Sequence, residues 1–366
     1  MAVLRIVLRG LGWLGGVGLV GAFGLGYAAP FLPPMQFWWV GPLAVGLPAL
    51  SAMVAVLSLI VGGWAAYRRR WGRLVGAGML LVLLAVRFGP RLGAWVPAVA
   101  TGEELSVMTF NVPNRSADAA TSGLVSVVRR ADPHVLALQE LPVRGGRSPR
   151  LAPGLRRLVG ETAFGLPDRV ASMRFQQPVA GRIALDSLTV HPLPPDGGSE
   201  ARSRFTRTFF RWRGRPAVLY NLHLHTVGEE KPWRVMWRHG WDWAAWLRSV
   251  RIYREGALRR AQQARLIRRM IAQESRPVIV AGDFNSTRHQ WAYRHIAQGL
   301  TDAVRWRVRG WAATFPAARP LVGIDHVLVS PAWRVVSARI PSLDEAAATS
   351  DHRPVVTHIG WRAPAP

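Results

Sequence analysis

Residues 278–291 read VIVAGDFNSTRHQW, and this stretch combines a strand with the polar residues that follow it. Residues 278–280 form a short apolar run of the kind that occurs in buried strands. Gly282 permits a turn where the run ends. Asp283 and Asn285 then place a carboxylate and a carboxamide at the mouth of the strand, where a packed core does not accommodate them. We therefore expect a functional site at the end of this strand.

Other predicted strands end in the same way. A single polar residue at a strand end is usually a cap or a turn residue, but six segments that each deliver Asp, Asn, Glu or His predict one shared site, because open α/β sheets bind ligands beyond their strand ends. The other five segments are TFN with Asn111, ALQE with Glu140, YNLHLH with Asn221, His223 and His225, IDH with Asp325 and His326, and SDH with Asp351 and His352.

The order of the predicted elements indicates an α/β fold. Strands are expected at 105–112 and 134–140, with a helix at about 119–130 between them. Later strand segments alternate with a long helical stretch at about 233–273 and with hairpin turns such as RGRP. Helical crossovers combined with hairpins predict mixed sheets rather than a purely parallel one.

The residue types at the strand ends indicate the chemistry. Carboxylates and carboxamides in a chain without cysteine suit a hard cation such as Mg²⁺, which binds one or two carboxylates together with substrate phosphate and water. Histidines beside carboxylates suit acid–base chemistry near neutral pH. The absence of cysteine excludes disulfides, thiolate nucleophiles and zinc–cysteine sites.

Six motifs occur in the order TFN, ALQE, NLHL, AGDFN, IDHV and SDH. This series resembles that of the endonuclease/exonuclease/phosphatase superfamily, which includes deoxyribonuclease I-like nucleases, inositol polyphosphate phosphatases and neutral sphingomyelinases. The resemblance covers about residues 104–360. It implies a four-layer α/β sandwich of two mixed β-sheets, and a phosphoesterase that depends on Mg²⁺, for which Mn²⁺ can substitute. With its apolar N-terminal segments, the chain is similar to bacterial membrane-anchored members.

The resemblance also implies metal ligands and catalytic residues. Glu140 is expected to be the principal metal ligand, with Asn111 and Asp351 completing the metal and phosphate shell. The catalytic residues are expected to be His352, which faces the attacking water or the scissile phosphate, Asp325, which orients it, Asp283 and Asn285, which position the nucleophile and bind a phosphate oxygen, and His223, which stabilises the transition state or protonates the leaving oxygen. Whether His352 or Asp283 takes the proton stays open at this stage.

Three residues are assigned to substrate binding on the same resemblance: Asn221, Asn285 and His225. His225 shares a strand face with His223, although a structural role is the competing interpretation. Strand alternation turns His326 away from the face of Asp325. The family often has an aspartate where this chain has His134, which we interpret as a residue of local structure.

The N-terminal part of the chain has the composition of a membrane anchor. Residues 10–67 form a stretch of 58 residues without Asp, Glu, Lys, Arg or His, which is long enough for two spans of roughly 20 residues each. A third apolar run at 74–86 spans only if it includes flanking residues. A cleaved signal peptide is the alternative for the first span, but the second apolar segment that follows at once favours an uncleaved anchor.

These segments predict the domain organisation and the topology. Residues 1–100 are expected to form an anchor with two to three transmembrane helices, and residues 101–366 the catalytic domain. The arginine loop of Arg68, Arg69, Arg70 and Arg73 places the N-terminus and this loop in the cytoplasm. If the third segment spans, the catalytic domain of this multi-pass cell-membrane protein is extracytoplasmic, and otherwise it is cytoplasmic.

The charge of the chain is strongly positive. Residues 1–100 contain eight arginines and no acid, so +18 of the formal charge of +26 belongs to residues 101–366. Such a domain attracts phosphate-rich partners such as nucleic acid or an anionic membrane. The alternative interpretation is that the excess arginine mainly keeps the domain soluble.

Residues 233–246 contain five tryptophans with arginines between them. Trp233, Trp237 and Trp241 recur at helical spacing, which indicates interfacial membrane contact, base stacking in a basic groove, or packing on the core of the domain.

We therefore expect a membrane-anchored phosphodiesterase that hydrolyses nucleic acid by direct water attack. A phospholipid or sphingomyelin-type phosphodiesterase or phosphatase is the alternative, and a catalytically silent binding module at the membrane is the third hypothesis. The expected partners are a phosphate-containing substrate and the membrane, and no protein partner is predicted.

Overall fold

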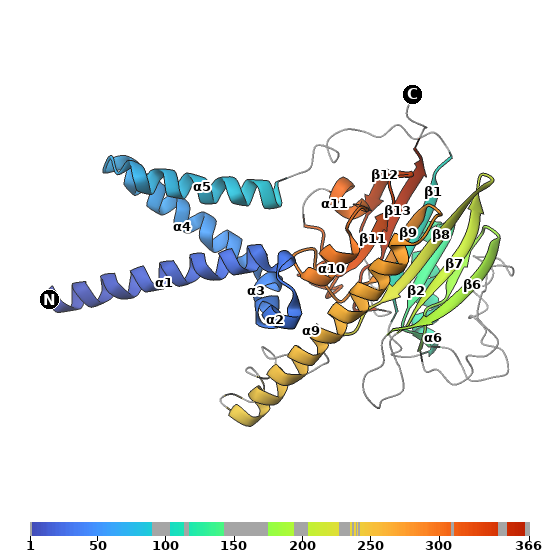
Figure 1. The fold of residues 1–366 in the computed structure, drawn as a ribbon, viewed down its shortest axis with the longest axis horizontal. Helices are drawn as coiled ribbons and strands as arrows, with labels where there is room; N and C mark the ends of the chain where they lie inside the picture. The colour runs from blue at the N-terminus through green and yellow to red at the C-terminus, as the bar shows by residue number, and fades with distance from the viewer. Residues whose placement is uncertain are drawn as a thin grey trace. The chain divides into compact units, whose positions relative to one another are not determined.

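The computed structural model describes residues 2–89, 103–112, 117–142, 175–193, 204–226, 235, 238, 240, 242–308, 311–342 and 350–362. The chain divides into two compact units, which are drawn in Figure 1 and described separately here. The first unit contains Met1–Pro90 with His289–Arg294, and the second contains Arg91–Arg288 with His295–Pro366.

The first unit is helical and apolar. Three of its helices are long and apolar enough to cross a membrane, over Gly10–Phe31, Leu47–Tyr67 and Trp71–Phe88. The third is 18 residues long, so the segment that looked short in the sequence reaches a usable length once its flanking residues join the helix. The helices of this unit are α1 (Ala2–Ala28), α2 (Pro34–Phe37), α3 (Gly41–Val45), α4 (Leu47–Tyr67) and α5 (Trp71–Phe88).

Small residues hold α4 and α5 close together. A Cβ atom built on Gly62 would lie 3.4 Å from the Cβ of Ala77, so the two helices are in van der Waals contact at this point. Glycine and alanine at a helix–helix contact are typical of membrane helices, which lack a hydrophobic driving force between them. Phe23, Leu47 and Val54 form the buried cluster between α1 and α4.

The second unit contains two mixed sheets. In the five-stranded sheet, the order is β12 (Trp333–Arg339), β13 (Val355–Trp361), β1 (Leu105–Asn111), β2 (Val135–Gln139) and β5 (Val179–Gly181). In the six-stranded sheet, the order is β10 (Thr301–Asp302), β11 (Asp325–Val329), β9 (Val278–Asp283), β8 (Arg215–His223), β7 (Arg204–Trp212) and β6 (Leu185–Pro192). The pairs β1–β2 and β8–β9 are parallel, and the other neighbouring strands are antiparallel.

The two sheets pack face to face over one core. Val107 and Ala137 of the five-stranded sheet belong to the same buried cluster as Leu219 and Ile279 of the six-stranded sheet. Alternate residues of β1 and β2, such as Phe110, face outward and pack on α6 (Ala117–Ala131). Figure 1 shows α9 (Trp243–Ala272) lying across the six-stranded sheet. The prediction of an α/β fold with two mixed sheets is thereby confirmed.

Several shorter elements complete this unit. The long helix α9 begins at Trp243, where the Asp242 side chain accepts a hydrogen bond from the Ala245 N–H and caps the helix. Val235 and Arg238, which are described in the segment before it, are also helical, in agreement with the predicted helical stretch from about residue 233. Trp233, Trp237 and Trp241 lie outside the described residues. The remaining elements of this unit are β3 (Leu141–Pro142), β4 (Phe175–Gln176) and α11 (Ala303–Arg307), whereas α10 (Trp291–Ile296) is divided between the two units after Arg294.

Candidate functional site

Strand register brings the polar residues of the six-stranded sheet side by side. In the parallel pair β8–β9, His223 lies opposite Asp283. In the antiparallel pair β9–β11, Asp325 lies opposite the same Asp283. The end of β8, the end of β9 and the start of β11 therefore lie side by side at one end of the sheet. They place the imidazole of His223 beside the carboxylates of Asp283 and Asp325.

The five-stranded sheet contributes two polar side chains from the ends of its strands. Asn111 ends β1, and Glu140 follows β2 directly. The Asn111 Nδ2 group donates to Glu140 Oε1 at 3.1 Å and to Asp283 Oδ2 at 3.0 Å. This amide joins the two sheets at the site, although Asn111 and Asp283 are 172 residues apart in the sequence.

The backbone at the end of β9 explains the glycine of the opening motif. Gly282 has φ of +142°, and a Cβ atom at this position would lie 2.0 Å from the carbonyl oxygen of Leu222. Only glycine fits this close approach of β9 to β8. Two further residues of the site, Glu140 at +55° and Asn285 at +44°, hold positive φ directly after their strands. The turns that aim these side chains are therefore unusual backbone conformations for residues other than glycine.

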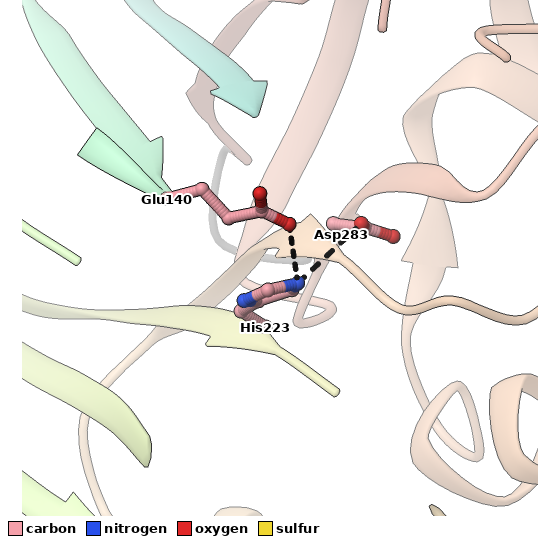
Figure 2. Close-up of side chains that lie close together, drawn as sticks. All are labelled: Glu140, His223 and Asp283. Carbon is pink, nitrogen blue, oxygen red and sulfur yellow. Dashed lines mark ion pairs between the residues drawn. The ribbon is translucent and has the colours of Figure 1, made fainter. Parts of the chain in front are cut away.

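The first cluster of the site is half open to solvent. His223 Nε2 lies 3.2 Å from Glu140 Oε1 and 3.8 Å from Asp283 Oδ2, as Figure 2 shows. Glu140 and His223 are half-buried, whereas Asp283 is buried. We call Glu140, His223 and Asp283 the open cluster, and its ligand atoms all lie within 4.8 Å of one another.

The second cluster lies deeper and shares one carboxylate with the first. His352 Nδ1 lies 2.9 Å from Asp325 Oδ2, and His352 Nε2 lies 3.9 Å from Asp283 Oδ2. All three side chains are buried. We call Asp283, Asp325 and His352 the closed cluster. Because Asp325 holds Nδ1, the Nε2 atom of His352 is the one directed toward Asp283 and the open cluster.

The electrostatics of the two clusters are coupled. Burial raises the pKa of Glu140, but the hydrogen bond and charge of His223 outweigh it, and the pKa falls to about 2. Burial lowers the pKa of His352, but the charges of Asp325 and Asp283 outweigh it, and the pKa rises to about 10. The pKa of His223 is raised in the same way, against burial, by Glu140 and Asp283. The carboxylates of the site therefore favour the protonated form of both imidazoles.

Burial also raises the pKa of Asp283, which the charges of the neighbouring histidines oppose only in part. This carboxylate belongs to both clusters. A carboxylate with a raised pKa is suited to accept a proton near neutral pH.

The open cluster has the donor set of a divalent-cation site. Glu140 and Asp283 supply carboxylate oxygens, and hard cations bind such oxygens. Asn111 Oδ1 is buried and, among the described residues, has no hydrogen-bond partner. An acceptor oxygen left in this state beside two carboxylates suits a cation, because an unpaired buried acceptor is otherwise costly. The predicted ligand Asp351 is half-buried and belongs to neither cluster.

The loop after β9 is fixed by hydrogen bonds. The Asn285 N–H donates to Asp283 Oδ1 at 2.7 Å, and its Nδ2 donates to the Leu224 carbonyl at 2.9 Å. The carbonyl of Asn285 accepts a hydrogen bond from the buried guanidinium of Arg260 on α9. The position of Asn285 is therefore determined by β8, β9 and α9 together.

Two residues that hold the site were not found from the sequence. One is Arg260, which lies in a helix with many arginines, and only its burial distinguishes it from the others. The other is Ser350, whose Oγ donates to the Asn111 carbonyl at 2.6 Å and accepts from the His352 N–H at 2.9 Å. Ser350 precedes Asp351 in the SDH motif, so its position in that motif was the available signal.

Asn221 lies away from the two clusters, in the interior between the sheets. It is fully buried, accepts from Gln139 Nε2 at 2.7 Å and donates to the Leu138 carbonyl at 2.9 Å. These contacts link β8 to β2. His225 is half-buried, and its N–H donates to Gln263 Oε1 at 2.8 Å. Substrate binding by Asn221 and His225 stays a prediction.

Two other histidines have structural contacts, as the sequence indicated. His326 Nε2 lies 2.9 Å from the Ser286 carbonyl oxygen, and its Nδ1 lies 3.8 Å from Asp302. His134 Nδ1 accepts from the Ser106 N–H at 3.0 Å. Both contacts hold neighbouring segments of the fold in place.

The sequence model of the Endonuclease/Exonuclease/phosphatase family matches residues 108–352, which contain every residue of the two clusters. The chain belongs to this family. Its members are typically phosphoesterases and nucleases, and its enzymes use divalent metal ions. A comparison with curated proteins finds no match.

Solved structures of low sequence identity share the fold. One is an endonuclease/exonuclease/phosphatase from Bacteroides vulgatus, with 20% identity, a TM-score of 0.53 and coverage of 71% of this chain and 99% of that chain. Another is a humanised D. rerio TDP2 with 14 mutations, with 15% identity, a TM-score of 0.50 and coverage of 70% of this chain and 99% of that chain. At these identities, the likeness concerns the fold alone.

Proposed function

We propose that this protein is a membrane-anchored phosphodiesterase that depends on Mg²⁺, for which Mn²⁺ can substitute, and that it hydrolyses nucleic acid by direct attack of water. The observation that carries the proposal is the meeting of the open and closed clusters at Asp283. Phosphoryl transfer consists mainly of positioning and of neutralising charge on the phosphate oxygens, and these clusters contain the groups for both.

In this proposal the open cluster holds the cation. Glu140 and Asn111 are its ligands, with Asp283 and His223 beside them and Asp351 in the surrounding shell. When bound, the cation neutralises negative charge on the phosphate. The low pKa of Glu140 keeps this carboxylate ionised and ready to bind at neutral pH.

The structure supports Asp283 rather than His352 as the proton acceptor. An imidazole with a pKa of about 10 carries its proton at neutral pH and cannot accept another. We therefore assign the proton of the attacking water to Asp283, whose pKa is raised. His352 Nε2–H then donates to a phosphate oxygen, and Asp325 holds the ring through Nδ1.

Two other residues act around this pair. The neighbouring carboxylates raise the pKa of His223, which favours its protonated form and suits it to donate to the leaving oxygen. Asn285 positions Asp283 through its N–H and binds a phosphate oxygen, as predicted from the motif.

Nucleic acid is the favoured substrate because the catalytic part carries +18 of the formal charge. A phospholipid is the second candidate, and the three apolar helices in the same chain favour it. Both substrates contain a phosphodiester, so the site chemistry does not distinguish them.

The test uses the full chain in lipid nanodiscs and a soluble aryl phosphodiester, with Mg²⁺ or with a chelator. The expected result is turnover that requires the cation and is lost in Glu140→Ala and His352→Ala. Turnover that is absent, or unchanged in both variants, would support the catalytically silent module instead. Parallel assays with plasmid DNA and with mixed phospholipid vesicles then separate the two substrate classes.

We propose a multi-pass anchor with the catalytic domain outside the cytoplasm. Three candidate spans put the two ends of the anchor on opposite sides of the membrane, and the arginine loop 68–73 favours the cytoplasm. The chain has no cysteine, so a cysteine introduced at the exposed Ala332 can be labelled without background. A membrane-impermeant maleimide is expected to label it in intact spheroplasts, and labelling only after lysis would place the domain in the cytoplasm.

A further inference from the structure

The N-terminal half of α9 exposes four large apolar side chains, three of which share one face, whereas Ile252, which is 40% exposed, lies on the opposite side of the helix. Trp243 is 64% exposed, Leu247 is 58% exposed and Trp246 is 37% exposed. Residues three and four apart in a helix are neighbours, so these three form one continuous patch, which we call the tryptophan face. The rings of Trp243 and Trp246 meet edge to face, with centroids 5.7 Å apart.

The tryptophan face is separate from the side of α9 that packs inward. In the same part of the helix, Ala245, Ser249 and Tyr253 are buried and recur every four residues. These residues form the buried side of the helix, and Trp243 and Leu247 lie outside it. Figure 1 shows that the N-terminal half of α9 extends past the strands, whereas the C-terminal half lies across the sheet.

The charged side chains in this part of α9 are all positive. Arg248, Arg251 and Arg254 are exposed, and residues 243–254 contain no Asp or Glu. Tryptophan is enriched at the headgroup level of bilayers, and arginine binds lipid phosphates. A helix with exposed tryptophan and leucine beside arginine therefore has the composition of an interfacial helix.

The same chain contains the helices that bring a bilayer within reach. Fourteen residues join Phe88, the last residue of α5, to Glu103. Even fully extended, a segment of this length reaches about 50 Å. A tether of this length keeps the membrane at a high effective concentration, so weak contacts suffice for docking. Nucleic acid has no such tether.

We propose that the tryptophan face docks on the anionic bilayer in which the chain is anchored. The rings of Trp243 and Trp246 enter the headgroup region together with Leu247, and Arg248, Arg251 and Arg254 contact lipid phosphates. The proposal depends on the membrane anchor but not on the substrate. Because α9 also carries Arg260, which bonds the Asn285 carbonyl, docking orients the site relative to the membrane surface.

The test uses the full chain in nanodiscs, with an environment-sensitive nitrobenzoxadiazole label at a single introduced cysteine. Leu247→Cys places the label on the tryptophan face, and Gln262→Cys is the matched control, exposed on the same helix but in the half that lies across the sheet. In nanodiscs containing phosphatidylglycerol, we expect a blue-shifted emission and several-fold stronger quenching by nitroxide-labelled lipid at 247 than at 262.

The arginine contribution has its own variant. Replacing Arg248, Arg251 and Arg254 with Gln is expected to lower the lipid quenching at 247 in anionic nanodiscs and to leave it unchanged in nanodiscs of phosphatidylcholine alone. High salt is expected to have the same effect as the three substitutions, because it screens exposed charges.

Three outcomes would overturn the proposal. The first is equal quenching of the labels at 247 and 262. The second is shielding of the label at 247 from water only after single-stranded DNA is added. The third is shielding of this label in detergent that depends on protein concentration, which would indicate a second copy. Flotation of the nanodiscs first confirms that the chain is incorporated, and failure to incorporate would remove the anchor on which the docking depends. Turnover of the soluble aryl phosphodiester, measured on the same samples, tests the phosphodiesterase activity separately.

Discussion

The open and closed clusters share Asp283 but differ in what surrounds them. In the open cluster, Glu140 and His223 are half-buried, and the nearby Asn111 has an acceptor without a partner among the described residues. In the closed cluster, every member is buried, and His352 is bound to both oxygens of Asp325. The open cluster therefore has oxygen atoms available to bind a cation, whereas the charges of the closed cluster are paired with one another.

In the proposed phosphodiesterase, this difference separates two tasks. A cation site needs donors that are ionised and accessible, which describes Glu140. A charged hydrogen-bond donor to phosphate needs a fixed ring that keeps its proton, which describes His352. Carboxylate and histidine side chains thus have different roles in the two clusters because their exposure and their partners differ.

Removing the ionised ligand of the open cluster is expected to have the largest effect. Glu140→Gln keeps the size of the side chain but removes its charge, so we expect turnover to fall on the order of 10³-fold, as when an essential electrostatic group is lost. Calorimetric titration with Mg²⁺ and Mn²⁺ should show weaker binding. Glu255→Gln, an exposed substitution on α9, is the control and should behave as the wild type. Full activity in Glu140→Gln would show that the cation, if required, binds elsewhere.

Breaking the closed cluster is expected to have a smaller effect. His352→Gln removes the donor, and we expect turnover to fall on the order of 10²-fold. Asp325→Asn leaves the ring but loses the charge that holds it, so a smaller loss is expected, with a lower pKa of His352 measured by NMR titration. Because the two residues act as a unit, the double variant should be no worse than His352→Gln. Additive losses would show that they act independently.

Loosening the loop that joins the clusters is expected to reduce turnover about tenfold, which corresponds to roughly 1.4 kcal/mol. Arg260→Gln removes the charged donor to the Asn285 carbonyl and with it the position of the loop. A role in positioning Asp283 should lower kcat and shift the acidic limb of the pH profile while KM changes little. Arg260→Lys should restore part of the activity. Loss of thermal stability with an unchanged pH profile would indicate that Arg260 only supports the fold.

The pH dependence of stability distinguishes the clusters without any turnover. The pKa of His352 is raised from 6.5 to about 10, so its contribution is complete below pH 6.5 and is lost as the pH rises toward 10. The pKa of Glu140 is lowered from 4.5 to about 2, so its contribution is complete above pH 4.5 and is lost as the pH falls toward 2.

Thermal unfolding of the full chain with a chelator, across this pH range, is the measurement. His352→Gln should flatten the alkaline limb most, and Glu140→Gln should flatten the acidic limb most, with smaller changes in the other limb because the clusters are coupled. A wild-type alkaline limb in His352→Gln would contradict the raised pKa of that residue.

The sequence by itself determined the class of the fold and predicted the main residues of the candidate site. The apolar runs fix where strands form, and the polar residues at their ends cannot enter a core, so Asp283, Glu140 and His352 were identifiable as site residues before their positions were known. The apolar composition of residues 10–67 likewise required an environment other than water. These inferences depend on local pattern, which the sequence contains in full.

The tertiary structure alone decided how these residues divide into clusters. Asp283 belongs to both because β9 lies between β8 and β11, a pairing that joins segments far apart in the chain. The roles of Arg260 and Ser350, the interior position of Asn221 and the exposed side of Trp243 depend on burial and long-range contacts. A strand's own residues do not specify its neighbours, so contacts between distant segments, and the pKa values that follow from them, arise only when the sheets assemble.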